Sequence, residues 1–400
     1  MKRRGLRLAL AASVLGALAA VSGSVEPSNA RVDGGTAATR HTVKVGIIYS
    51  RTGLLSAFGA QYIQGLKLGL EYATKGTNRV NGHKIEITAV DDAGDPAKAV
   101  TAAKDLIGQG YKVIGGTVSS GIALQLAPLA EQNKILYISG PAATDAVTGL
   151  NRYTFRSGRQ TLQDTLAIEQ ILGRGVGRRI VVFAQDTAFG QGNVTAVRQV
   201  LGGRGHNVSS ILVPLSATDF TPFAERAREA RPDLLFVAWA GTTAPAMWRS
   251  LAQQRVPQAT KVATGLAERA TWGSYAPGTD FLSHYVFNGP KKNKVNDWLV
   301  AKMRRRGQAP DIFTPDGFVA AQMIVRAVQR GGDDVDRMIR GLEGWQFVAP
   351  KGVQRIRSQD HAMLQPMFHV RLRKVGNRYV PRVMARFAAG RVAPPAKSFP

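Results

Sequence analysis

Residues 85–116 read IEITAVDDAGDPAKAVTAAKDLIGQGYKVIGG, and this stretch decides the predicted fold. It begins with an apolar run at 85–90 and ends with a second one at 113–116. Between the two runs, Asp95-Pro96 is typical of a helix N-cap and first helical residue, and Gly110 is typical of a helix end. The order strand, helix, strand predicts a βαβ unit with buried parallel strands.

The same alternation continues along the chain on both sides of this unit. We expect further buried strands at 43–49, 135–139, 180–184, 208–214 and 234–238. Helices are expected at 61–73, 122–132, 191–201, 220–230 and 245–254. An interruption near 153–161 divides the pattern into two α/β domains of similar size. Parallel sheets bind ligands beyond the carboxyl ends of their strands, so the cleft between the domains is the expected binding site.

The N-terminus has the composition of an export signal. Basic residues within 2–7 precede an apolar run at 8–21, and small residues follow at 28–30. We expect a cleaved signal peptide at 1–30 and a linker at 31–40. A membrane anchor is the alternative, but this apolar run is shorter than the roughly 20 residues that a bilayer requires. No later segment of the sequence is long and apolar enough to span a membrane, so we expect an exported protein, periplasmic or associated with the cell envelope.

The composition gives one exclusion and one open question. The 400 residues include no cysteine, which excludes disulfides, a thiolate metal site, a cysteine nucleophile and a lipoprotein anchor. The 53 basic and 27 acidic side chains give a net charge of +26. No acidic residue follows Asp360, and this charge could hold the protein near an anionic envelope. The basic residues are not interleaved with aromatic ones, so nucleic acid is not an expected partner. Residues 381–400 are expected to form a flexible tail.

The motifs of the common enzyme classes are missing from the sequence. There is no phosphate-binding loop, dinucleotide fingerprint, nucleophile elbow or zinc-binding helix motif. The six histidines are scattered, and Asp91-Asp92 is interpreted as a turn cap rather than a catalytic pair. We therefore predict a binding protein and not an enzyme, with no catalytic residues, no metal and no cofactor.

Several loops at the expected strand ends share a resemblance. They are SRTGLLSAFG at 50–59, DDAGDPAKAV at 91–100, VSSG at 118–121, SGPAATD at 139–145, DTAFGQG at 186–192, and SQDH with QP at 358–366. In this order, they resemble the loops of the leucine/isoleucine/valine-binding proteins, the type I periplasmic solute-binding subunits of ABC importers. The resemblance covers residues 41–380.

The resemblance implies a fold and a set of partners. The fold is α/β, with two Rossmann-like doubly wound lobes joined by a hinge of three chain crossings. Lobe one would hold 41–160 and 287–347, and lobe two 161–286 and 348–380. A small solute would close the lobes by hinge motion, and an ABC permease would recognise the closed monomer. A ligand-sensing subunit for a signalling receptor is the alternative on the same fold.

The resemblance also suggests how a carboxylate is held. Ser119 and Ser120 would donate hydroxyl and backbone hydrogen bonds at the start of a helix, where an anion is favoured. Thr144 would add a hydroxyl and Ala143 a backbone group. These residues could alternatively serve only as helix caps. Phe58 would cover the apolar part of the solute, or alternatively fill the core.

An ammonium group would need an acceptor from lobe two. Glu268 is the candidate, although it could instead pair with Arg269 at the surface. The loop tyrosine of the family is replaced by Phe189, and Thr243 lies near the position of a second tyrosine. Each polar partner lost to a buried ammonium costs on the order of 1–3 kcal/mol. The expected solutes are therefore amino acids, aromatic or branched carboxylic acids, and amides.

Overall fold

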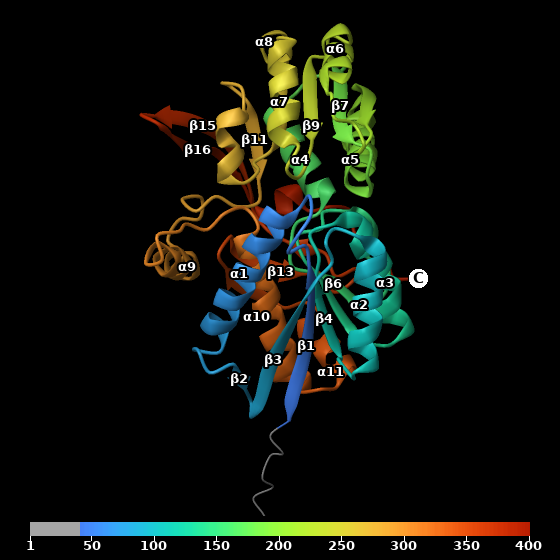
Figure 1. The fold of residues 1–400 in the computed structure, drawn as a ribbon, viewed down its shortest axis with the longest axis vertical. Helices are drawn as coiled ribbons and strands as arrows, with labels where there is room; N and C mark the ends of the chain where they lie inside the picture. Colours follow the sequence, from blue (N-terminus) through green and yellow to red (C-terminus); the bar gives the residue numbers. More distant parts are fainter. Residues whose placement is uncertain (1–40) are drawn as a thin grey trace, which may run out of the picture. The chain divides into compact units, whose positions relative to one another are not determined.

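The computed structural model describes residues 41–400, so the predicted signal peptide and linker lie outside the described residues. Two parallel-rich sheets with flanking helices make up most of this region (Figure 1). No helix within 41–400 is both long enough and apolar enough to cross a bilayer.

The first sheet has six strands in the spatial order β2-β3-β1-β4-β5-β6. Their bounds are Thr42–Tyr49 (β1), Arg79–Val80 (β2), His83–Asp91 (β3), Val113–Gly116 (β4), Leu136–Ser139 (β5) and Thr154–Arg156 (β6). The central strand β1 pairs in parallel with both β3 and β4. The covering helices are Ser56–Ala73 (α1), Pro96–Gly108 (α2), Ser120–Gln132 (α3), Thr314–Gly331 (α10) and Val335–Leu342 (α11).

The second sheet has seven strands in the order β16-β15-β11-β10-β9-β7-β8. Its strands are Arg179–Gln185 (β7), Asn207–Val213 (β8), Leu234–Ala238 (β9), Lys261–Gly265 (β10), Asp280–Ser283 (β11), Met367–Val375 (β15) and Arg378–Phe387 (β16). Its helices are Thr161–Leu172 (α4), Ala188–Val200 (α5), Thr221–Glu229 (α6), Ala244–Gln253 (α7) and Val256–Ala259 (α8). Only β15 and β16 run antiparallel to their neighbours. The two sheets confirm the predicted doubly wound α/β fold.

Alternation along each strand distributes apolar side chains to both faces of the first sheet. Ile47 packs with α1 and α10, whereas its neighbour Ile48 packs with α2 and α3. The predicted cap of α2 is confirmed, because the Asp95 carboxylate accepts hydrogen bonds from two backbone N–H groups of the first turn. The helix ends two residues before Gly110, which has φ +83° and turns the chain into β4.

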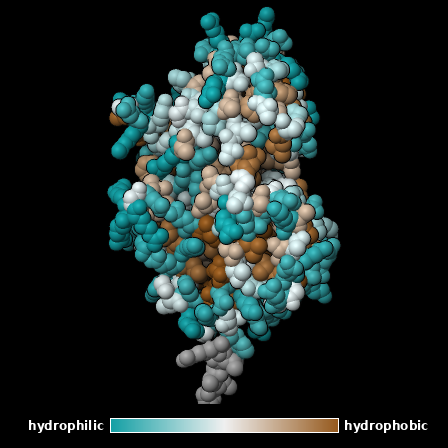
Figure 2. Space-filling view, in the orientation of Figure 1, coloured by the Kyte–Doolittle hydropathy of each residue, from teal (hydrophilic) through white to brown (hydrophobic). Residues whose placement is uncertain are grey.

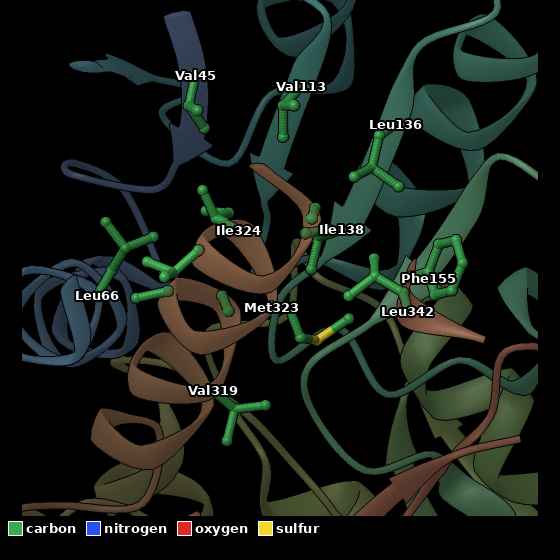
Figure 3. Packing of buried hydrophobic residues seen from close by; sticks show 14 of the residues in the cluster. Val45, Leu66, Val113, Leu136, Ile138, Phe155, Val319, Met323, Ile324 and Leu342 are labelled. Atoms are coloured by element: carbon green, nitrogen blue, oxygen red, sulfur yellow. The ribbon is translucent and has the colours of Figure 1, made fainter. Parts of the chain in front are cut away.

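Helices α1 and α10 approach each other closely because glycines lie at their contact. A Cβ added to Gly65 would come within 1.8 Å of the Thr314 carbonyl oxygen, and one added to Gly317 within 1.9 Å of the Tyr62 carbonyl oxygen. Figure 3 shows apolar side chains of α10, including Met323 and Ile324, packed beside those of the strands. The late helix α10 therefore completes the core of the first lobe.

The chain passes three times between the two sheets, at 157–160, 284–293 and 365–366. One predicted boundary is wrong. Residues 348–364 were expected in lobe two, but Ala349, Ile356 and Met363 are buried in the core of lobe one. They belong to a small antiparallel sheet of strands Gln346–Ala349 (β12), Gly352–Ile356 (β13) and Met363–Leu364 (β14). Helix α9 (Lys294–Arg304) also packs on lobe one.

The expectation of a flexible tail at 381–400 is also wrong. Residues up to Phe387 continue β16, paired with β15. Val392 is buried in the core of lobe two. Beyond it, the Lys397 N–H donates to the Asp360 carboxylate (3.1 Å), and Arg357 donates to the Pro394 carbonyl oxygen (2.8 Å). The Pro- and Ala-rich composition did not reveal these partners, because they lie far away in the sequence.

Candidate functional site

The first loop of the site is fixed by the two neighbouring aspartates. The Asp91 carboxylate accepts hydrogen bonds from the backbone N–H groups of Arg51 and Thr52. The Asp92 carboxylate accepts from the hydroxyls of Ser50 (2.6 Å) and Thr117 (2.7 Å). Burial acts to raise the pKa of Asp91, but the hydrogen bonds that its carboxylate accepts from Thr52, Ala93 and Arg51 together hold it below its usual range. The prediction that this pair caps turns is confirmed, and the pair orients the loop that leads into α1.

A cavity of about 480 Å³ lies between the two lobes. The apolar side chains that line it include Leu54, Leu55, Phe58, Val118, Phe189, Leu215, Trp239, Leu266, Ile312 and Phe313. The polar side chains are Ser119, Ser120, Arg159, Asp164, Gln185, Asp186, Thr187, Asn193 and Thr264. Both groups come from strand ends, from loops and from the N-terminal turns of helices, as expected for parallel sheets. A mostly apolar cavity with a few convergent polar groups is typical of a small-molecule site.

The two lobes touch at Leu54, a residue that lines this cavity. The backbone N–H of Thr242 in lobe two donates a hydrogen bond to the Leu54 carbonyl oxygen in lobe one (3.3 Å). Gly241 has φ +89°, and a Cβ there would meet the Leu54 side chain at 2.6 Å. In the described conformation, both lobes therefore line the cavity and touch each other at Leu54.

The structure brings five of the eight predicted site residues to the cavity. They are Phe58, Ser119, Ser120, Ala143 and Phe189. Phe58 packs edge-to-face on Phe313 with ring centroids 4.9 Å apart, so it is both a core and a lining residue. Ser119 caps α3 and faces the cavity as well, so the two interpretations of this serine are compatible. Their contact with a solute stays a prediction.

The other three predicted residues lie outside the cavity lining. The Thr144 hydroxyl accepts from the backbone N–H of Ala146 and caps a short 3₁₀ helix. The Thr243 hydroxyl accepts a hydrogen bond from the Trp239 indole N–H (3.0 Å), and only the indole side chain lines the cavity. Thr243 therefore orients Trp239 instead of facing the cavity.

Glu268 follows the lining residue Ala267 in sequence but is not itself part of the cavity lining. Burial raises the pKa of its carboxyl group, and the nearby charge of Asp311 raises it further. Arg269 does not pair with it, because the Arg269 backbone donates to Asp311 and its guanidinium to the Pro310 carbonyl oxygen. Within residues 41–400, the Glu268 carboxylate has no cationic partner, and its Oε2 atom accepts no hydrogen bond.

The sequence analysis missed the cation of the cavity, Arg159. Its Nε donates to both carboxylate oxygens of Asp164, at 3.1 and 3.3 Å, and its Nη1 to the Pro141 carbonyl oxygen at 3.4 Å. Nη2 forms no hydrogen bond within the described chain, which leaves donors for a ligand. Burial raises the pKa of Asp164, and Arg159 opposes that shift. The sequence offered one signal for this role, because Arg159 lies where the α/β pattern is interrupted.

A second group of buried charges lies at the hinge, next to Phe313. Asp316 accepts a hydrogen bond from Lys351 (2.6 Å) and lies 3.2 Å from the His284 ring. All three side chains are inaccessible to solvent or nearly so. Burial lowers the pKa of His284 to about 4, although Asp316 opposes the shift. Within 41–400, no three His, Asp or Glu side chains gather closely enough to hold a metal ion.

Comparison with known proteins identifies the class. The model of the periplasmic binding protein family matches residues 42–377, so the chain belongs to this family. It is 23% identical to Leu/Ile/Val-binding protein homolog 3 of Brucella melitensis, over 74% of this chain and 80% of that protein. It is also 23% identical to Leu/Ile/Val-binding protein BraC3 of Rhizobium johnstonii, over 74% of this chain and 81% of that protein.

Two solved structures extend the comparison. An ABC-type branched-chain amino acid transporter protein of Rhodopseudomonas palustris is 33% identical, with a TM-score of 0.74 over 89% of this chain and 99% of that one. A solute-binding protein of an ABC transporter from the same species, in complex with 3,4-dihydroxybenzoic acid, is 25% identical. Its TM-score is 0.77 over 87% of this chain and 98% of that chain. These similarities confirm the type I periplasmic binding protein fold that the resemblance implied.

Proposed function

We propose that this protein is the solute-binding component of an ABC importer and that its solute is a small carboxylic acid with an aromatic or branched apolar part. The observation that carries this proposal is the lining of the cavity between the lobes. It combines one cation, Arg159, with five aromatic residues: Phe58 and Phe313 from lobe one, and Phe189, Phe236 and Trp239 from lobe two. Rings from both lobes would contact a flat solute on both of its sides. Solute binding would therefore stabilise the closed arrangement of the lobes.

The carboxylate of the solute binds where donors converge. Arg159 offers its free Nη2 donors, and a charged hydrogen bond of this kind contributes about twice as much as a neutral one. Ser119 and Ser120 lie at the N-terminus of α3, which has 13 residues and favours an anion. Similarity supports this assignment, because one neighbour at 25% identity is a complex with 3,4-dihydroxybenzoic acid.

An amino acid is the second candidate, favoured by a different observation. The Glu268 carboxylate, which follows Ala267 in sequence, has no cationic partner in the described chain, and Asp186 at the cavity is exposed. Either carboxylate could accept the ammonium group after a small rearrangement. The relatives described as Leu/Ile/Val-binding proteins and the branched-chain amino acid neighbour agree with this candidate.

A ligand panel separates the candidates. We would measure the melting temperature of the protein with benzoate, 4-hydroxybenzoate, leucine, phenylalanine and benzamide. A ligand at 100 times its Kd stabilises by about 2.7 kcal/mol, which raises the melting temperature by several degrees. The proposal predicts a shift with an aromatic or branched acid and none with benzamide. A shift with leucine or phenylalanine alone favours the amino acid, and no shift with any acid contradicts the proposal.

The remaining parts of the proposal concern location and partners. A signal peptide at 1–30 would export the chain as a protein without a lipidated cysteine. The solute-loaded, closed monomer would deliver its solute to a membrane permease. Cell fractionation and uptake of labelled solute by a deletion strain test these two steps.

A further inference from the structure

The hairpin of strands β15 and β16 has two different faces. In Figure 1 it projects away from the other elements of the second lobe. Its inner face, which includes Leu372, Tyr379 and Val383, packs on the core of this lobe. Its outer face carries four exposed arginines: Arg371, Arg373, Arg378 and Arg382. We call this outer surface the basic hairpin face.

The arginines of this face lie close to one another, so their positive charges repel. Arg371 and Arg382 lie directly opposite each other on the paired strands. Like charges in this position destabilise a sheet. Arg371 is held by the Asp280 carboxylate (2.7 Å), but the other three form no ion pair within the described chain, 41–400. An unpaired cationic surface of this density has its natural complement in an anionic partner.

Exposed apolar side chains lie between the arginines. Val375, Val380 and Met384 are 53%, 40% and 41% exposed, and they are among only seven large apolar side chains that the described residues expose. In Figure 2, most residues around the edges of the visible side of the molecule are hydrophilic. Charge alone would protect an edge strand from aggregation, whereas exposed valines and a methionine would not. The mixture of cations and apolar side chains is typical of surfaces that lie on membranes.

We propose that the basic hairpin face docks on an anionic phospholipid bilayer. The arginines contact phosphate groups, and Val375 and Val380, near the tip of the hairpin, enter the headgroup region. A second copy of the chain is a poor occupant, because pairing β16 with itself would bring arginines beside arginines. The contact would keep the solute-binding protein close to the membrane that holds its permease.

Vesicle sedimentation tests the proposal. The mature protein, residues 31–400, is mixed with vesicles of phosphatidylcholine alone or of phosphatidylcholine and phosphatidylglycerol, and the bound fraction is measured. The double variant Arg373→Gln/Arg382→Gln removes two charges of the basic hairpin face. The matched control, Arg226→Gln/Arg228→Gln, removes two exposed arginines from α6 on the same lobe. Melting temperature and solute affinity show that each variant is folded.

We expect binding only to vesicles that contain phosphatidylglycerol, and weaker binding at higher salt. Each arginine at a membrane surface changes the partition coefficient about fivefold, so the hairpin variant should lose about 25-fold and the control much less. Val375→Ser/Val380→Ser should also weaken binding without changing the charge. No binding by the wild-type protein, or equal losses in the hairpin variant and the control, overturns the proposal. If the wild-type protein does not bind vesicles but the hairpin variant loses solute uptake, the basic hairpin face contacts an acidic protein instead. This result also overturns the proposal.

Discussion

Replacement of Arg159 by glutamine separates the ligand role of this residue from its structural role. If the free Nη2 donors bind the carboxylate of the solute, Arg159→Gln removes a charged hydrogen bond from a site that both lobes line. Such a bond contributes about 1.5–3 kcal/mol. The Kd for the solute should therefore rise roughly 10- to 150-fold.

The same substitution also affects stability. It leaves Asp164, which is 6% exposed, without the cation that donates two hydrogen bonds to it. Removing one partner of a buried ion pair costs about 3–5 kcal/mol. The raised pKa of Asp164 limits this cost, because the carboxyl group becomes protonated more readily. The double variant Arg159→Gln/Asp164→Asn removes both charges of this pair and should regain most of the stability.

The assay pairs urea denaturation with isothermal titration of the tightest-binding acid in the ligand panel. The single variant should lose both stability and affinity, whereas the double variant should regain stability and remain defective in binding. Wild-type affinity in the double variant would show that Arg159 does not bind the carboxylate. If the double variant loses affinity and does not regain stability, misfolding alone explains the loss of affinity in the single variant.

Three further predictions concern the fold. Gly65→Ala should lower the free energy of unfolding by about 3 kcal/mol or more, because its Cβ would lie 1.8 Å from a backbone oxygen of α10. Gly192→Ala is the control and should raise the free energy of unfolding by about 0.5–1 kcal/mol, because no atom lies near its Cβ on α5. Urea denaturation measures both values. The pKa of His284 is lowered to about 4 in the folded protein, so the unfolded chain binds the proton first as the pH falls. Stability should be complete above pH 6.5 and decline by about 3 kcal/mol towards pH 4, and His284→Asn should flatten that slope. Removal of residues 394–400 should lower the free energy of unfolding by about 2 kcal/mol in the same assay, because it eliminates the hydrogen bonds to Arg357 and Asp360. An unchanged free energy of unfolding would support the original expectation of a flexible tail.

Local patterns were sufficient to predict the fold class. The run at 85–90, the cap at Asp95 and the glycine at 110 specify a βαβ unit without any knowledge of distant contacts. The assignment of 348–364 to a lobe was wrong because short strands carry little local information. Their buried side chains pack in one cluster with residues of α10, which lie far away in the sequence.

The candidate site was predictable only in part, and the reason is geometric. Residues at the start of the helix that follows a strand, such as Phe58 and Ser119, reach the cavity because strand ends point towards the cleft. Thr243 and Glu268 also follow strands, but neither is part of the cavity lining, which includes Trp239 and Ala267. Arg159 belongs to a chain crossing, whose position depends on how the two lobes are arranged.

Native mass spectrometry of the protein purified from its own host tests the central claim most directly. The account predicts one bound solute per chain, a small carboxylic acid with an aromatic or branched apolar part, released by denaturation and absent from the Arg159→Gln/Asp164→Asn variant. A bound solute without a carboxylate, or one retained fully by that variant, would contradict the account.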